Sequence, residues 1–300
     1  MIGEIAALGA AISWAIAPLF YKKALVNTNP ISANIVRCLT NGFVLVVLLF
    51  SIGKAGVLLS LPAWALILTV ISGIIGLGIG DTLYMVGLKS IGVSRAVPLS
   101  STYPLFSLIW AVFLLGQPLP SLALVGAVFI LIGIWLVSKQ KSDNIKSNLK
   151  NRASLIGISA SLITAIVWSI SLALMDIVVS ESAASTLDAN YALVTLRMAA
   201  VALFSLTLAG FVGKERGFAK ISRKGVFFLC VGGLIANGLG WVLMNYSFIL
   251  IPQTQAVPIS STSPLFAALA GFLLFRENVT ARVAVGALAI VAGIILVFLV

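Results

Sequence analysis

The chain contains no histidine, two cysteines and only eight acidic residues among its 300 residues. The absence of histidine removes the commonest general base and the commonest metal ligand of proteins. Cys38 and Cys230 each lie inside an apolar run, so we interpret them as small buried side chains that indicate no disulfide framework. We therefore expect no metal site and no cofactor.

Charge is scarce as well. Charged residues make up 9% of the chain and hydrophobic residues 61%. A soluble domain has about 25% charged and about 45–50% apolar residues. The charges lie in short segments between apolar runs that are close to the ~20 residues needed to cross a ~30 Å hydrocarbon core. We predict an all-α integral membrane protein embedded in the lipid bilayer of the cell (cytoplasmic) membrane.

The net charge of +11 does not indicate a nucleic-acid partner, because the Lys and Arg residues lie in connecting loops. In membrane proteins this excess marks the cytoplasmic side.

The apolar runs predict ten spanning helices with short connections. Their approximate ranges are 3–21, 31–52, 64–88, 95–115, 121–138, 154–178, 190–212, 225–249, 255–275 and 281–299. The polar stretch 139–153 separates five helices from five helices, which predicts a first repeat at 1–138, a basic linker at 139–153 and a second repeat at 154–300.

The two halves are related in sequence. Residues 96–106 read AVPLSSTYPLF and residues 256–266 read AVPISSTSPLF, so nine of eleven positions are identical at an offset of 160. Further pairs are Arg37 with Arg197 and Gly80 with Gly240 at that offset, and Trp14 with Trp168 at a slightly different one. Chance does not easily produce this agreement, so we infer an internal duplication.

An odd number of helices per repeat places the second copy in the membrane upside down relative to the first. The loops after the first, third, fifth, seventh and ninth helices hold sixteen Lys and Arg residues, and the opposite side holds only Lys54. The rich side is predicted to be cytoplasmic, with the linker 139–153, and both termini face out. Two inverted five-helix repeats are the architecture of many secondary transporters.

These features resemble one family. Ten helices in two units, an arginine in the second helix of each unit, and AVPxSSTxPLF in the fourth are similar to the EamA-domain branch of the drug/metabolite transporter superfamily. The segment GDTLYMVGLKSIGVSRAVPLSSTYPLF is similar to that family's signature of the third and fourth helices. The resemblance covers nearly the whole chain. It implies a transporter of amino acids, other metabolites, nucleotide sugars or toxic compounds, with a central cavity.

Pro104 and Pro264 lie inside apolar helices, where proline frees the carbonyl four residues back, here that of Ser100 and of Ser260. In lipid such helix breaks are tolerated where they face protein, hydroxyl groups or a watery cavity. We favour a substrate-binding wall over a structural kink, and its candidate residues are Ser100, Ser101, Tyr103, Ser260, Ser261 and Ser263.

Two further stripes offer binding residues. Asn237, Trp241 and Asn245 recur every four residues and share a helix face. Their amides bond either to neighbouring helices or to substrate. One aromatic stripe contains Trp14, Pro18 and Tyr21, and a second contains Trp168 and Ser171. These stripes serve either packing or ligand binding.

Asp81 is a rare acid inside a predicted helix, and Tyr84 follows it by one turn. An acid at this depth costs at least ~2.5 kcal/mol on insertion scales. It is interpreted either as a buried ion pair with Arg37, which we favour, or as a proton carrier or a site for a substrate amine. Arg197, with Asp176 as a possible partner, is expected to be solvated near a helix end.

Glycines recur seven residues apart in the predicted fifth and tenth helices, as Gly126 with Gly133 and Gly286 with Gly293. They indicate close packing of these helices against the bundle or against a second copy of the chain. A monomer and a homodimer are both compatible with this pattern.

The function that we predict is secondary transport or facilitated movement of a small metabolite, most simply an amino acid or a related compound, by alternating access around a central cavity. The alternatives are a multidrug exporter of the same fold and an integral-membrane enzyme acting on lipid. The enzyme is disfavoured because eight acids, no histidine and no Asp-rich motif provide no recognisable catalytic residues.

Overall fold

The computed structural model describes residues 1–106, 109, 121–138, 147–181, 186–211, 221–251, 256, 259–275 and 280–298. Every regular element in this part of the chain is helical. The elements before residue 139 are α1 (Ile2–Leu25), α2 (Pro30–Ser51), η1 (Ala55–Ser60), α3 (Ala63–Gly73), η2 (Ile74–Gly80), α4 (Asp81–Ile91), α5 (Val93–Ser100) and α7 (Ser121–Ser138). Those after residue 146 are α8 (Ser147–Glu181), α9 (Leu187–Phe211), α10 (Arg223–Gly233), η5 (Leu234–Gly240), α11 (Trp241–Leu250), α13 (Ser263–Phe275) and α14 (Ala281–Phe298).

Several of these helices are long and apolar enough to span a membrane. Within the described residues six helical runs meet this criterion: Ile2–Leu25, Pro30–Ser51, Ala63–Ile91, Arg152–Val179, Leu187–Ala209 and Arg223–Leu250. Two shorter apolar runs, Leu124–Val137 and Ala281–Leu296, lie in α7 and α14. The prediction of an all-helical membrane protein is confirmed at this level.

The ends of the predicted segments differ from the helices in places. Residues 147–153, expected to belong to the linker, form the first turns of α8, because hydropathy detects the apolar run and not the end of the helix. Of the linker, residues 139–146 lie outside the described part. Much of the expected fourth segment, beyond Phe106, lies outside it as well.

The third long helix of each half contains a π-helical segment. In Ala63–Ile91 it is η2, and 160 residues later, in Arg223–Leu250, it is η5. Both segments are glycine-rich and both end in a glycine, Gly80 and Gly240, that packs against a tryptophan ring. A Cβ at Gly80 would lie 2.9 Å from Trp168, and one at Gly240 would lie 2.7 Å from Trp14. Only glycine permits this approach, and π-helical turns often mark functional sites.

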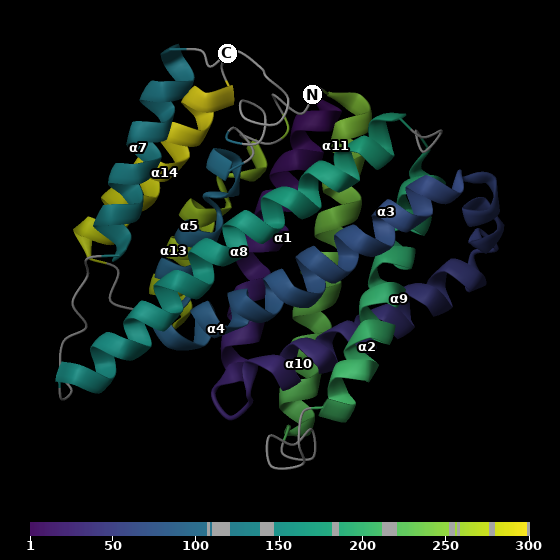
Figure 1. Cartoon of the computed structure of the whole chain (residues 1–300), viewed down its shortest axis with the longest axis horizontal. Helices are drawn as coiled ribbons and strands as arrows, with labels where there is room; N and C mark the ends of the chain where they lie inside the picture. Colours follow the sequence, from purple (N-terminus) through teal and green to yellow (C-terminus); the bar gives the residue numbers. More distant parts are fainter. Residues whose placement is uncertain are drawn as a thin grey trace.

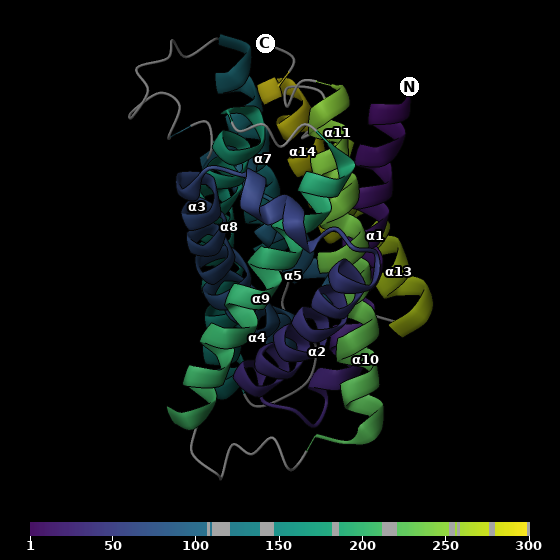
Figure 2. The same cartoon turned by 90° about the vertical axis from the view of Figure 1, so that its right-hand side faces the viewer.

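The first helix of each half packs against helices of the other half. α1 runs along α10, η5 and α11 of the second half, whereas α8 runs along α3, η2 and α4 of the first half. α2 and α9 pack against each other and complete the arrangement (Figures 1 and 2). The N- and C-terminal labels lie at one end of the bundle, and the C-terminal ends of α7 and α9 lie at the other (Figure 1).

α7 and α14 form a separate antiparallel pair at the side of the bundle (Figure 1). A Cβ at Gly133 would lie 2.6 Å from the carbonyl oxygen of Gly286, and one at Gly293 would lie 2.5 Å from that of Gly126. The four glycines therefore bring these two helices into close contact with each other inside one chain.

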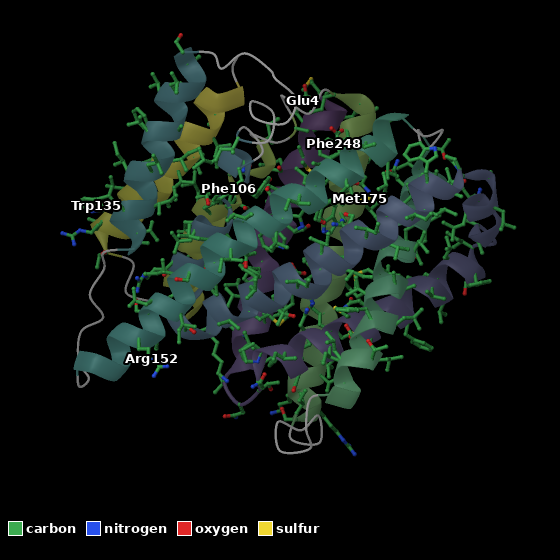
Figure 3. The ribbon with its side chains drawn as sticks, viewed as in Figure 1. Glu4, Phe106, Trp135, Arg152, Met175 and Phe248 are labelled. Atoms are coloured by element: carbon green, nitrogen blue, oxygen red, sulfur yellow. The ribbon has the colours of Figure 1, made fainter. Side chains whose placement is uncertain are left out.

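The outer surface of the bundle is apolar. Phe43, Phe50, Leu203 and Trp135 are more than half exposed in the isolated chain, and the labelled Trp135 points away from the bundle (Figure 3). Buried side chains include many polar ones, among them Asn34, Arg37 and Asp81. An apolar exterior with buried polar groups is the pattern expected for a protein surrounded by lipid.

Candidate functional site

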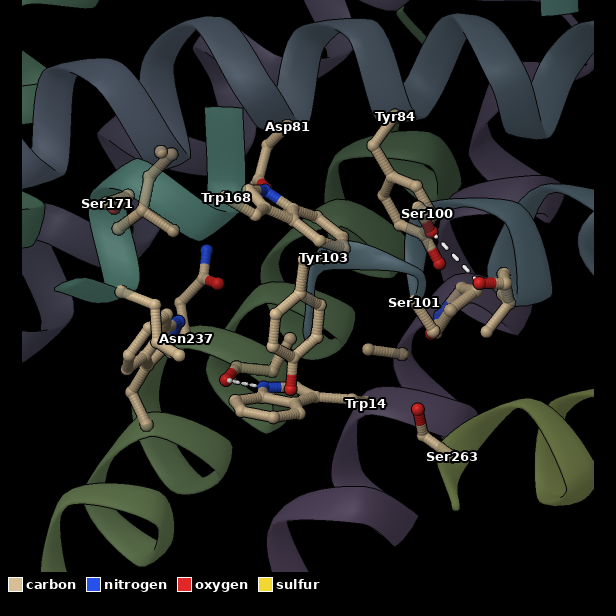
Figure 4. A pocket seen from close by; sticks show the side chains of 18 of the residues that line it. Trp14, Asp81, Tyr84, Ser100, Ser101, Tyr103, Trp168, Ser171, Asn237 and Ser263 are labelled. Carbon is tan, nitrogen blue, oxygen red and sulfur yellow. Dashed lines mark hydrogen bonds between the residues drawn. The ribbon is translucent and has the colours of Figure 1, made fainter. Parts of the chain in front are cut away.

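A cavity lies where the two halves meet. Its volume is about 90 Å³. Its walls come from α1, α2, η2, α4, α5, α8, α9, η5, α11 and α13 (Figure 4). Its lining residues are Trp14, Ala17, Pro18, Tyr21, Arg37, Gly76, Leu77, Asp81, Tyr84, Val97, Ser100, Ser101, Tyr103, Trp168, Ser171, Leu172, Arg197, Ala236, Asn237, Trp241 and Ser263.

Most of the predicted binding residues line this cavity. The structure brings together Trp14, Asp81, Tyr84, Ser100, Ser101, Tyr103, Trp168, Ser171, Asn237, Trp241 and Ser263. Asn245, Ser260 and Ser261 are buried but do not line it. Asn245 lies one turn, about 6 Å, beyond Trp241 along α11, so the predicted stripe extends past the cavity.

The helix that carries the proline motif is interrupted in both halves. α5 ends at Ser100, turns at Ser101 and Thr102 and resumes at Tyr103; α13 begins at Ser263 after the equivalent turn. Thr102 Oγ1 donates to the carbonyl of Leu99 at 2.7 Å, and its counterpart Thr262 donates to that of Ile259 at 2.7 Å. Hydroxyl groups thus replace part of the missing backbone bonding at each turn.

Ser100 lines the cavity with its hydroxyl already engaged. Its Oγ donates to the carbonyls of Ala96 at 2.9 Å and Val97 at 3.1 Å, a shared bond within its own helix. Ser261 lies behind the wall, where its Oγ is 3.3 Å from the hydroxyl of Tyr103. The lone pairs of Ser100 remain available to a ligand donor, since a hydroxyl that donates can also accept.

Asp81 forms a buried ion pair with Arg37. The Oδ2–Nη2 distance is 2.6 Å, and the two residues are 3% and 1% exposed. Oδ1 of Asp81 accepts a bond from Trp168 Nε1 at 2.9 Å, which ties α4 to α8. Arg37 also donates to Asn34 Oδ1 at 2.6 Å and to the hydroxyl of Tyr21 at 3.4 Å. Both oxygens of Asp81 are therefore occupied by side chains of the protein itself.

The expectation that Arg197 is solvated is wrong. Arg197 is 1% exposed and lines the cavity, because α9 begins at Leu187 and ten residues of helix carry this side chain about 15 Å inward. Its Nη2 donates to Ser171 Oγ at 2.6 Å, and its guanidinium carbon lies 3.9 Å from the centre of the Trp241 ring. Among the residues that the structure describes, its Nε and Nη1 have no hydrogen-bond partner.

Ser171 is held in place by Ser72 across the junction of α8 and α3. Ser171 Oγ donates to the carbonyl of Ser72 at 2.7 Å, and Ser72 Oγ donates to the carbonyl of Ser171 at 2.8 Å. This reciprocal pair fixes the position at which the guanidinium of Arg197 is bound.

Aromatic rings form much of the remaining wall. Trp14 and Trp241 meet edge to face with centroids 5.7 Å apart, and Tyr84 and Trp168 lie 5.0 Å apart. Trp14 Nε1 donates to the carbonyl of Ala236 at 3.2 Å, so both cavity tryptophans of α1 and α8 are anchored to the other half. The close-up shows the rings of Trp14, Tyr84 and Trp168 around that of Tyr103 (Figure 4).

Several lining residues were not predicted as binding residues. Ala17, Leu77, Val97, Leu172 and Ala236 are small or apolar and carry no sequence signal that separates them from packing residues. Arg197 did carry one, because it is the repeat counterpart of Arg37. Among the described residues no group of three or more Cys, Asp or Glu side chains lies together as a metal site would require.

Buried charges, a largely apolar cavity with aromatic and charged side chains in its wall, and an apolar exterior indicate a multi-pass membrane protein with a cavity in its interior. The sequence model of the EamA-like transporter family matches residues 1–139 and 155–299. The chain therefore belongs to the EamA-like transporter family and is a membrane transporter, as the resemblance in sequence implied.

One protein is similar to this chain in sequence, and one solved structure is similar to it in fold. A protein of Archaeoglobus fulgidus described as an uncharacterized transporter is 29% identical over 299 residues, which cover 100% of this chain and 99% of the relative. One solved crystal structure superposes on 98% of this chain and 95% of its own, with a TM-score of 0.61 and 17% identity, a likeness that shows the fold alone. The family and the relative's description point to a transporter rather than an enzyme.

Proposed function

We propose that the chain is a secondary transporter or facilitator that moves a small metabolite across the cytoplasmic membrane by alternating access. In this proposal ten spanning helices form two inverted five-helix repeats, and the repeats rock against each other around the central cavity. The substrate crosses the bilayer through that cavity, which opens to one side at a time.

The observation that carries the proposal is the symmetry of the cavity wall. Sixteen of its 21 residues form pairs from equivalent positions of the two halves. At an offset of 160 these are Arg37 with Arg197, Gly76 with Ala236, Leu77 with Asn237, Asp81 with Trp241, and Tyr103 with Ser263. At an offset of 154 they are Trp14 with Trp168, Ala17 with Ser171, and Pro18 with Leu172. A site at the interface of two inverted halves, built largely from their equivalent positions, is the arrangement typical of alternating access.

Charge supports the proposed orientation. The N- and C-terminal labels share one end of the bundle, and the ends of α7 and α9 that precede basic loops lie at the other (Figure 1). We place the basic end, with residues 139–153, in the cytoplasm and the termini outside.

Flux through the cavity provides the test. Wild-type protein in proteoliposomes loaded with unlabelled metabolite is expected to accumulate the labelled compound by counterflow. Ser100→Val should lower that flux several-fold while the protein still folds, because the substitution removes a polar wall group. Thr207→Val is the matched control, since Thr207 is exposed on the outer surface of α9 and bonds only its own helix. Equal flux in wild type and Ser100→Val would contradict a binding role for this wall.

A further inference from the structure

The charged side chains that line the cavity carry a positive excess. Its charged lining residues are Arg37, Arg197 and Asp81, two guanidinium groups against one carboxylate. Asp81 is near enough to act on Arg197 electrostatically, but its two oxygens are bonded to Arg37 and Trp168. Arg197 thus lacks a bonded carboxylate of its own.

The duplication explains how this asymmetry arises. The arginine of α2 and the arginine of α9 are repeat counterparts, and each lies beside the first residue after a π-helical segment. In the first half that residue is Asp81, which neutralises Arg37. In the second half it is Trp241, whose ring contacts Arg197 but carries no charge. A cation–π contact is attractive but supplies no negative charge, so it does not replace an ion pair.

Hydrogen-bond donors without a partner in the cavity wall indicate that an anion binds there. Arg197 Nε and Nη1 and Asn237 Nδ2 are buried and have no hydrogen-bond partner, and both residues line the cavity. Leaving a buried charged donor unbonded is costly, so such groups are found paired or in contact with a ligand. Both residues belong to the wall that also contains Trp14, Trp241 and Tyr103.

Resting on the proposed transport function, we infer that the transported ligand is a small organic acid whose carboxylate pairs with Arg197. Asn237 donates a further hydrogen bond to the carboxylate, and the tryptophan and tyrosine rings enclose the apolar body of the ligand. One monoanion neutralises the single excess positive charge. A phosphate ester carries about −1.5 to −2 charge at pH 7 and leaves an uncompensated negative charge in the cavity.

The same geometry disfavours amines. Each oxygen of Asp81, the sole acid in the cavity wall described above, already accepts a bond, and Arg37 balances the charge of this carboxylate. An ammonium group entering the cavity therefore meets two guanidinium groups and one carboxylate that is already paired, so the amine of an amino acid adds a further positive charge to a site with a positive excess. A plain carboxylic acid is therefore preferred to the corresponding amino acid and to an organic cation.

Binding to the purified full-length chain in detergent tests the inference through acid–amide pairs. The probes are acetate with acetamide, phenylacetate with phenylacetamide, and indole-3-acetate with indole-3-acetamide, followed by calorimetry. At least one acid is expected to bind about tenfold or more tightly than its amide, since a hydrogen bond to a charged group contributes about 1.5–3 kcal/mol. Equal binding within all three pairs overturns the inference, as does tighter binding of phenethylamine, phenylalanine or phenyl phosphate than of phenylacetate.

Variants assign the effect to Arg197. Arg197→Gln should weaken binding of the acid about 10- to 100-fold and leave the amide unchanged, and Arg197→Lys should retain part of the preference. Thr195→Val is the control on the same helix, because Thr195 is buried, bonds the carbonyl of Tyr191 and does not line the cavity. If Arg197→Gln changes thermal stability but not the acid–amide preference, Arg197 is structural and the inference fails.

Counterflow in proteoliposomes separates this inference from the proposed function. Acid binding that depends on Arg197, without flux of any bound compound, leaves the anion site intact and removes the transport function. Flux of another class of metabolite, without binding of any acid probe, leaves the transport function intact and removes the anion site.

Discussion

Two arginines at equivalent positions have opposite electrostatic roles in this molecule. Arg37 is neutralised by Asp81 at 2.6 Å, whereas Arg197 contacts the serine hydroxyl of Ser171 and the ring of Trp241. Removing one partner of a buried ion pair leaves an uncompensated charge, which costs about 3–5 kcal/mol. Removing an arginine that has no bonded acid leaves no such charge.

This difference predicts unequal effects of one substitution at two matched sites. Arg37→Gln should lower the free energy of unfolding by about 3–5 kcal/mol, because Asp81 stays buried without its cation. Arg197→Gln should cost much less. Thermal unfolding of the purified variants measures both, and similar losses at the two sites would contradict the assignment of Asp81 to Arg37.

A double substitution checks the same pair. In Arg37→Gln/Asp81→Asn both charges are absent, so much of the stability lost in Arg37→Gln should return, with a coupling energy of about 0.5–3 kcal/mol. Additive losses would indicate that Asp81 is held by Trp168 and not by Arg37.

At the scale of elements, the glycine contacts between α7 and α14 hold two helices at backbone distance. A methyl group at Gly133 meets the carbonyl of Gly286 at 2.6 Å, and backbone cannot yield as a flexible side chain does. The sequence predicted close packing from the seven-residue spacing but left the partner open. The partner was undetermined because small residues mark a close approach without identifying the surface that approaches.

Gly133→Ala is therefore expected to destabilise the fold by about 1–3 kcal/mol through overpacking. Gly56→Ala is the matched control, since no atom lies within 4 Å of the Cβ position at Gly56, and its effect should stay within about 0.5 kcal/mol. Thermal unfolding in detergent measures both variants. Equal stability of the two would show that α7 and α14 adjust their separation without cost.

The positions of the helix interruptions could be predicted from the two prolines. Proline cannot donate to the carbonyl four residues back, so Pro104 and Pro264 predict a local break wherever they lie in a helix. The details at the turn depend on hydroxyl groups, with Thr102 and Thr262 bonding the carbonyls three residues back. Ser260 and Ser261 lie behind the cavity wall although their motif matches the first half almost completely, because the two halves contribute different residues to a site that is no longer symmetric.

At the scale of the whole molecule, the orientation that we propose rests on the distribution of charge. Asn27 lies between α1 and α2, next to basic residues, and Ser60 lies at the opposite end of α2 in η1; both are exposed. In a background with Cys38→Ser and Cys230→Ser, a membrane-impermeant thiol reagent should label Ser60→Cys in intact cells. Asn27→Cys should be labelled only after the membrane is permeabilised. The reverse pattern would invert the proposed orientation.

The sequence by itself determined the class of protein and the family, and it predicts the duplication. Each of these depends on local quantities: the length of apolar runs, the identity of residues at a fixed offset, and the distribution of Lys and Arg. It also selected most of the cavity residues, because a polar or aromatic side chain in an apolar helix needs a buried partner or a ligand.

Only the tertiary structure decided which of those side chains satisfy one another. Asp81 is occupied by Arg37 and Trp168, Ser100 bonds its own helix, and Arg197 lies inside the bundle with unused donors. Hydrogen bonds form over about 3 Å between helices that are far apart in the sequence, so their pairing depends on how the halves pack. Residue type and spacing indicated that charge is buried in this membrane protein, and packing of the two halves determined that one positive charge is left over.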